Sequence, residues 1–478
     1  MSGNILAILP EILLLILGIV ILIVDPFWKE ENRRINLGWL TAGGLAVVAV
    51  ISVLIARPGD AQFAFGGMVR FDWLGFSFKM FFIFGAAITA LFMMDIEHVN
   101  RRAEAYILLV AATIGMSLMA SAADLVMLYL AIETTSIPLY VLAGFLKDDD
   151  RSTEAGFKYL LFGAMTSTVL LYGFSLLYGI SGQTSLYEIA SKFTSFNPLT
   201  LGVLFLVLIG LAFKVSLVPF HFWAPDVYEG APTPIAGFLS TASKAAGFVV
   251  VLRIFVVVFP GIAANWELIL AILATLTMTL GNFLALAQKN IKRMLAYSSI
   301  AHAGYAMIGV VSFSKLGVTS TAFYLIAYIL TNLAAFGAVS AVGNITGSND
   351  MKAYHGLQRR APGLALVMLV AFLSLAGMPP FGGFVAKVFV FNAAIEKGWI
   401  WLAVVGILNS IIGVYYYLTV LKYVYLYRIE GEEEEKHLIF LSRPYAIALT
   451  VLSLGILLVG AFFGPWYAIA NSAAINLF

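Results

Sequence analysis

The chain has 478 residues, of which 61% are hydrophobic and only 11% are charged. A soluble domain carries about 25% charged residues, so this composition excludes one and indicates a polytopic membrane protein. The net charge of +2 gives no indication of a nucleic-acid partner. The sequence has no cysteine, which excludes disulfides, cysteine-ligated iron–sulfur clusters and thiolate chemistry within this chain. Its five histidines lack metal-ligand spacing.

About fourteen apolar segments approach or exceed the roughly 20 residues that a helical span needs. The sequence therefore predicts an all-α polytopic membrane protein with about fourteen transmembrane helices. The segments cover residues 4–24, 36–56, 74–94, 104–121, 124–145, 155–180, 199–221, 233–258, 267–287, 293–312, 318–344, 362–394, 399–426 and 444–467.

The basic residues between the spans predict the orientation of the chain. Sixteen Lys and Arg residues fall in odd-numbered loops and six, Lys79 among them, in even-numbered loops. Cytoplasmic loops carry the excess of Lys and Arg, so the odd loops should be cytoplasmic. Both termini then lie on the outer side of the cell inner membrane. The acidic run 430–437, EGEEEEKH, should be a solvated surface loop.

Several charged residues near span ends have simple explanations. Arg253 and Lys422 lie close enough to an end for their charged groups to reach the interface, which is called snorkelling. Glu11 is expected to be an interfacial carboxylate at the outer end of the first span. Lys158, one turn into its span, is either a snorkelling residue or a candidate relay group.

Four charged residues lie too deep in the spans for such explanations: Glu133, Lys214, Lys244 and Lys387. A lysine at the centre of a membrane helix costs about 2.5–3.5 kcal/mol on insertion scales, so it indicates function by default. Burial lowers the pKa of a lysine and a neighbouring carboxylate raises it again, so a Glu–Lys pair can act as a proton switch. We predict that Glu133 pairs with Lys214, that Lys244 receives the proton through water, and that Lys387 is the last site before release.

Two histidines are candidate relay groups, because histidine titrates near neutral pH. They are His221, beside a predicted helix break, and His302, in YSSIAHAGY. Structural alternatives remain open for all of these residues. His221 could cap the broken helix, and His302 could be a hydrogen-bonded core residue. Glu133 and Lys214 could form a static ion pair, and Lys244 could donate to carbonyls freed by a break.

Two spans appear broken, at 218–226 (VPFHFWAPD) and at 375–384 (LAGMPPFGGF). Interrupted segments at matching positions of two halves are typical of inverted-repeat transporters. The breaks are five spans apart, and an odd offset inverts the second unit. We therefore predict two inverted five-helix repeats with broken helices 7 and 12. The predicted divisions are three N-terminal helices (1–98), helices 4–8 (99–258), helices 9–13 (259–428), and the acidic loop with helix 14 (429–478).

These residues resemble a known family, the antiporter-like membrane subunits of proton-pumping NADH–quinone oxidoreductase (respiratory complex I), and most closely its N type. The resemblance rests chiefly on 213–248, FKVSLVPFHFWAPDVYEGAPTPIAGFLSTASKAAGF. PDVYEGAPTP and Lys387 favour the N type, because the L and M types differ in the first and the M type has a glutamate at the second. Further matches are IETTSIPLY (132–140), EAGFKYLLFGA (154–164), NIKRMLAYSSIAHAGY (290–305) and SLAGMPPFGGFVAKVFVF (374–391).

The resemblance implies that this chain moves protons from the cytoplasm to the outer side without a redox centre of its own. NADH, FMN, iron–sulfur clusters and quinone would be bound by partner subunits. The implied neighbours in the bilayer are the antiporter-like subunit M and small subunits such as K and J. The family's proton-carrying positions match Glu133, Lys214, Lys244 and Lys387. Its other polar-axis positions match Lys158, His221 and His302.

Two other functions compete with this one. A subunit of an Mrp-type cation/proton antiporter would share the fold and the Glu–Lys pair, although PDVYEGAPTP argues against it. Genes for peripheral NADH-oxidising subunits beside this one would exclude that alternative. A stand-alone solute carrier would use the buried charges to bind its substrate, and the purified chain alone would then transport.

Overall fold

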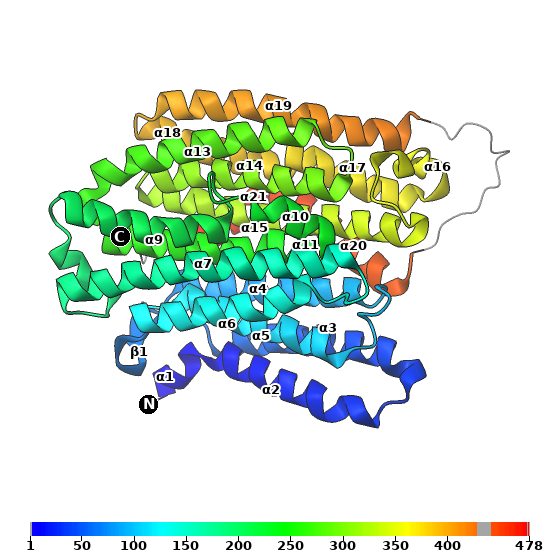
Figure 1. The fold of residues 1–478 in the computed structure, drawn as a ribbon, viewed down its shortest axis with the longest axis horizontal. Coiled ribbons are helices and arrows are strands. Elements are labelled where there is room, and N and C mark those ends of the chain that lie inside the picture. Colours follow the sequence, from blue (N-terminus) through cyan, green and yellow to red (C-terminus); the bar gives the residue numbers. More distant parts are fainter. Residues whose placement is uncertain (1, 428–440, 476, 478) are drawn as a thin grey trace.

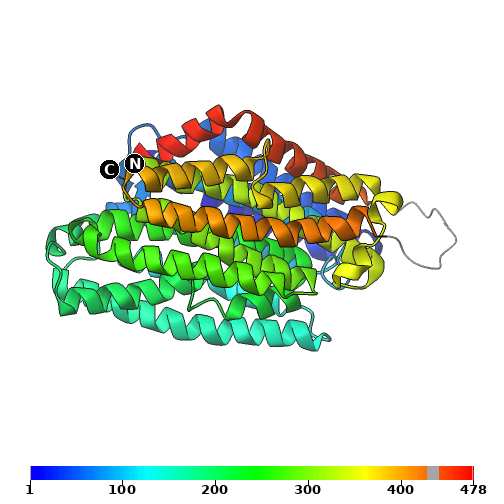
Figure 2. The same cartoon turned by 90° about the horizontal axis from the view of Figure 1, so that it is seen from above.

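In the computed structural model, residues 2–427, 441–475 and 477 are described, with the side chains of 2–4 and 30–34 left out. The acidic run 430–437 therefore lies outside the described residues. The helices lie side by side in one bundle and most run along its long axis (Figure 1). Both ends of the described chain lie at the same end of this bundle (Figures 1 and 2), as an even number of crossings requires.

The α-helices are α1 (Ser2–Ala7), α2 (Leu9–Val24), α3 (Glu30–Ile55), α4 (Trp73–Met93), α5 (Ala103–Ser121), α6 (Leu125–Ala143), α7 (Asp150–Ser181), α8 (Leu186–Ile189), α9 (Pro198–Val215), α10 (Trp223–Gly230), α11 (Thr233–Phe238), α12 (Lys244–Arg253), α13 (Ala263–Leu286), α14 (Ile291–Val311), α15 (Lys315–Thr346), α16 (Leu357–Arg360), α17 (Pro362–Ala376), α18 (Gly382–Glu396), α19 (Ile400–Tyr425), α20 (Arg443–Ala461) and α21 (Phe463–Ile475).

Shorter elements connect them. The π-helical segment η4 (Leu239–Ser243) joins α11 to α12, and a second one, η5 (Ile254–Val258), continues α12, so that the four elements form one continuous span. The 3-10 segments are η1 (Asp25–Phe27), η2 (Phe65–Gly67), η3 (Ala190–Lys192), η6 (Pro260–Ile262) and η7 (Met351–Tyr354). Strands β1 (Gln62–Ala64) and β2 (Val69–Phe71) form a small antiparallel hairpin in which Gln62 is paired with Phe71.

The described residues contain 13 helices that are long and apolar enough to cross a membrane. Each corresponds to one predicted span, which confirms the helical, polytopic fold. The remaining predicted span, 362–394, consists of two 15-residue helices, α17 and α18. The most apolar 18-residue stretches of the spans Thr233–Val258 and Lys315–Thr346 are completely buried, because these spans are apolar all round and form the centre of the bundle.

The chain leaves the α-helix at both predicted breaks. Helix α9 ends at Val215, Ser216 is left-handed (φ 59°), and α10 begins only at Trp223. Helix α17 ends at Ala376, after which Gly377 is left-handed (φ 82°). Each break contains a cis X–Pro bond, at Pro219 and at Pro380. Such breaks leave the last carbonyl groups of a helix without their usual partners.

Arg253 corrects one prediction made from span ends. Its side chain does not snorkel: it is 1% exposed, and its guanidinium is 2.8 Å from the Asp72 carboxylate. Nε also donates to the carbonyl oxygen of Ala120 at 2.8 Å. The prediction was wrong because it used only the distance of Arg253 from the end of its own apolar segment. The hydropathy pattern carries no information on which neighbouring helix a side chain meets. Lys422, by contrast, is exposed in the last turn of α19.

Glu11 and Lys79 correct two further predictions. Lys79 was counted above with the loop residues, although the predicted span 74–94 contains it; it lies within α4 and is 3% exposed. Glu11 is 6% exposed rather than interfacial, and its Oε1 atom is 2.8 Å from Nζ of Lys79. The first span is therefore joined to α4 by a buried ion pair. The hydropathy of single segments cannot predict such a pair.

Candidate functional site

Lys214 lies in the last turn of α9, beside the first break, and is 7% exposed. Its Nζ atom donates to Oγ of Ser136 on α6 at 2.8 Å. Glu133, one turn earlier on α6, accepts a hydrogen bond from Ser167 on α7. The ion pairs in the described part of the chain do not include Glu133 with Lys214. The predicted pair is therefore not a direct contact.

A small cavity nevertheless joins these two residues. Glu133, Ser136, Ser167 and Lys214 line it together with Tyr140, and it has room for roughly one water molecule. A buried water needs about two to four polar partners, which these side chains supply. Glu133 and Lys214 thus line one shared cavity, which also has several apolar residues in its wall.

Lys244 is the first residue of α12, directly after the π-helical segment η4, and is 2% exposed. Its Nζ atom donates to the carbonyl oxygen and to Oγ of Ser299 on α14, both at 2.9 Å. Both acceptors are neutral oxygens. The ammonium group is thus held at the centre of the bundle without a carboxylate among these partners.

His302 lies one turn beyond Ser299 on α14 and is 6% exposed. Its Nδ1 atom is 2.7 Å from the hydroxyl of Tyr324, and Nε2 is 3.1 Å from the hydroxyl of Tyr417. The Tyr417 hydroxyl also bonds to Ser298. A neutral imidazole has one donor and one acceptor nitrogen, so a ring bonded at both nitrogens can connect two hydroxyl groups.

Lys387 lies within α18, its ammonium group reaches back to the second break, and it is 5% exposed. Its Nζ atom donates to the carbonyl oxygens of Leu375 and Ala376, each at 3.0 Å, and to Oγ of Ser410 at 2.8 Å. These carbonyls end α17, where the partial negative charge of a helix is located. A cation at this place satisfies the acceptors that the break exposes.

Helix α14 connects the two central lysines. Ser299, His302 and Tyr305 are spaced by three residues, so they share one face of the helix. Ser299 binds Lys244, and the ring of Tyr305 lies 5.1 Å from Nζ of Lys387. Polar and aromatic side chains on one face of α14 thus lie between the ammonium groups of Lys244 and Lys387.

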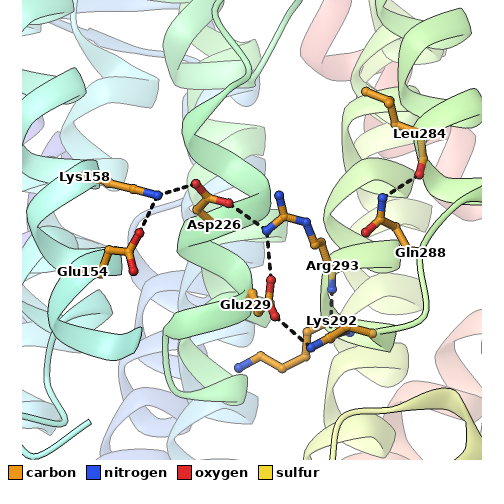
Figure 3. A network of polar contacts seen from close by, with 9 residues as sticks. Glu154, Lys158, Asp226, Glu229, Leu284, Gln288, Lys292 and Arg293 are labelled. Carbon is orange, nitrogen blue, oxygen red and sulfur yellow. Dashed lines mark hydrogen bonds and ion pairs between the residues drawn. The ribbon is translucent and has the colours of Figure 1, made fainter. Parts of the chain in front are cut away.

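Lys158 and His221 lie apart from this line of contacts. Lys158 forms ion pairs with Asp226 and Glu154, both at 2.6 Å, and is about one-third exposed (Figure 3). His221 lies in the first break, 5% exposed, with its ring against Phe222. Its Nδ1 atom has no hydrogen-bond partner in the described part of the chain.

Sequence reasoning missed several residues of this site. Asp226 and Glu229 of α10 both bind Arg293 of α14, at 2.7 and 2.9 Å. Asp226 follows Pro225 in the first broken segment, which was a usable signal. The hydroxyl partners of the lysines, such as Ser136 and Ser299, had no such signal, because serine is common in membrane helices. No group of three or more possible metal ligands occurs among the residues described.

Fold and site together define an α-helical membrane protein with a line of ionisable side chains through its interior. The sequence profile of the NADH:quinone oxidoreductase/Mrp antiporter transmembrane family matches residues 122–413. The chain therefore belongs to that family, in its subunit N branch, as its relatives of known name show. One is NADH-quinone oxidoreductase subunit N of Trichlorobacter lovleyi, 43% identical over 96% of this chain and 94% of the relative.

Solved structures give the same fold. A chain of respiratory complex I from Thermus thermophilus with bound aureothin is 33% identical, with a TM-score of 0.80 over 96% of this chain and 98% of that one. A chain of the Mrp complex from Dietzia sp. DQ12-45-1b has a TM-score of 0.82 over 100% and 98%, at 21% identity. At that identity the second match shows a shared fold alone.

Proposed function

We propose that this chain is a proton-translocating membrane subunit of an NADH–quinone oxidoreductase, and that quinone reduction takes place in other subunits. The observation that carries the proposal is the set of three buried lysines, Lys214, Lys244 and Lys387, whose ammonium groups donate to neutral oxygens. The names of the relatives support the complex to which the chain is assigned.

The chemistry of the buried lysines supports proton transfer. An ammonium group that faces a carboxylate is stabilised in its charged form, whereas one that faces neutral oxygens has only hydrogen bonds to offset its burial. The second kind can release and regain a proton at a smaller energetic cost. Glu133 lines the same cavity as Lys214. It can favour the charged form of Lys214 when the two side chains approach and the neutral form when they separate.

The contacts suggest an order of transfer. A proton taken up near Glu133 and Lys214 passes to Lys244, then along Ser299 and His302 to Lys387, and leaves on the outer side. Tyr417 assists because its hydroxyl contacts both Ser298 and His302. His221, which lies in the first break, is the candidate relay on the uptake side.

The chain lies in the cell inner membrane with both termini on the outer side, beside subunit M and small subunits such as K and J. NADH, FMN, iron–sulfur clusters and quinone are bound by partner subunits. The two breaks support two inverted five-helix units, helices 4–8 (99–258) and 9–13 (259–428).

The test uses the assembled complex in inverted membrane vesicles. Lys244→Ala should leave the complex assembled while NADH-driven acidification and quinone reductase activity fall severely. Lys422→Ala, an exposed lysine at the end of α19, is the matched control and should change neither. Normal acidification by a verified, assembled Lys244→Ala complex would refute the proposal.

A further inference from the structure

The short helix α10, which follows the first break, is held from two sides (Figure 3). On one side, Arg293 of α14 pairs with Asp226 and Glu229, and Nζ of Lys292 donates to the carbonyl oxygen of Ala231 at 2.7 Å. On the other side, Lys158 of α7 pairs with Asp226 at 2.6 Å. The Asp226 carboxylate thus bridges α7 and α14, one oxygen to each.

The Lys158–Asp226 contact can separate at low cost, because both charges have another partner. Lys158 also pairs with Glu154, one turn away on its own helix, at 2.6 Å. Asp226 would keep Arg293 at 2.7 Å. Separation therefore leaves neither charge unpaired, which removes the largest penalty for breaking a partly buried ion pair. Two basic residues of α14, Arg293 and Lys292, bind α10, whereas Lys158 is the one basic residue of α7 that pairs with it among the described ion pairs. Loss of the Lys158–Asp226 pair would therefore loosen α10 on its α7 side and leave its polar contacts with α14 in place.

An aromatic stack lies beside this contact. Tyr159, which follows Lys158 on α7, stacks on Trp223 of α10 with ring centroids 4.5 Å apart and planes at 7°. Tyr159 also meets the edge of Tyr140 on α6 at 4.7 Å. All three rings are buried. Tyr140 lines the cavity of Glu133 and Lys214, so the stack leads from the ionic contact to that cavity.

We propose that Asp226 is a positioning residue. Through Lys158 it holds α10 against α7, keeps Trp223 on Tyr159, and thereby closes the Lys214 cavity to water from this side. The inference deepens the proposed function and rests on it, because Lys214 needs water on its uptake side only while it exchanges a proton. Lys158, predicted above as a relay candidate, acts here as a separable partner of Asp226.

The absence of cysteine from the chain gives a direct test. Val250 is fully buried and lines the cavity, and Val250→Cys is close to isosteric. The assembled complex with this cysteine is placed in inverted vesicles and treated with a small, positively charged methanethiosulfonate. The mass of this chain then reports the labelling rate, whatever cysteines the partner subunits contain.

The expected result is slow labelling in the Val250→Cys parent. Adding Asp226→Asn or Lys158→Gln should each increase the rate about fivefold or more, the effect of removing one modest coupling contact. Glu154→Gln is the matched control, because it takes a carboxylate from the same ammonium at the same 2.6 Å without touching α10. It should leave the rate unchanged.

Two outcomes would overturn the inference: equal rates in all four proteins, or acceleration by Glu154→Gln as large as by Asp226→Asn. If Asp226→Asn fails to assemble, Lys158→Gln decides the question, since it leaves Arg293 paired with Asp226. The labelling needs no NADH and so is independent of pumping. Failure of the proposed function would appear separately, as normal acidification by Lys244→Ala.

Discussion

The Nζ atom of Lys387 lies 3.0 Å from the carbonyl oxygen of Ala376, the last residue of α17. The proline-interrupted segment exposes this carbonyl in the interior, and the lysine of the next half-helix binds it. Removing either feature would leave the other without its partner. The break and the charge therefore form one structural unit, although they are separate features of the sequence.

Replacement of Lys387 tests this unit. Lys387→Met should destabilise the subunit by about 1–3 kcal/mol, the cost of leaving a buried acceptor unsatisfied, and should also stop proton pumping. Thermal unfolding of the purified complex and NADH-driven acidification of vesicles measure the two effects. The control is Lys397→Met, which removes an exposed lysine just beyond the end of the same helix. Equal losses in the two variants would contradict the assignment.

Glu133→Gln should reduce pumping less than Lys214→Ala does. Lys214 binds Ser136 directly and meets Glu133 only across the cavity, and a glutamine can still accept the hydrogen bond of Ser167. Initial rates of acidification in vesicles with equal amounts of assembled complex give the comparison. If the two variants lost pumping equally, Glu133 would be as essential as the lysine, contrary to this geometry.

Tyr417→Phe removes the hydroxyl that contacts both Ser298 and His302 but keeps the ring. We expect acidification about tenfold slower, equivalent to about 1.4 kcal/mol and within the range for one hydrogen bond, with assembly unchanged. Tyr415→Phe, an exposed tyrosine on the same helix, is the comparison. An unchanged rate for Tyr417→Phe would remove this hydroxyl from the relay.

Arg253→Leu should be among the most destabilising substitutions in the chain. It leaves Asp72 buried and unpaired, and breaking a buried ion pair from one side costs about 3–5 kcal/mol. The amount of assembled complex and its unfolding temperature report the loss. Adding Asp72→Asn should recover part of it, because the unpaired charge is removed. Full stability of Arg253→Leu would show that the pair does not brace α4 against α12.

The sequence by itself determined the membrane class, the spans and the places where helices break. Hydropathy is a sum over neighbouring residues, and proline acts on its own backbone, so both are readable along the chain. The depth of Lys214, Lys244 and Lys387 within their spans was equally visible. Their burial in the structure agrees with it.

Only the tertiary structure decided which groups these charges meet. Arg253 and Asp72 are 181 residues apart, and Lys214 and Ser136 are 78 apart. Their contacts depend on which helices pack together and on how each helix is rotated about its axis. Neither property produces a periodic pattern in the sequence. For the same reason Lys214 faces a serine where a carboxylate was predicted, and the ion pair between Lys79 and Glu11 was not predicted.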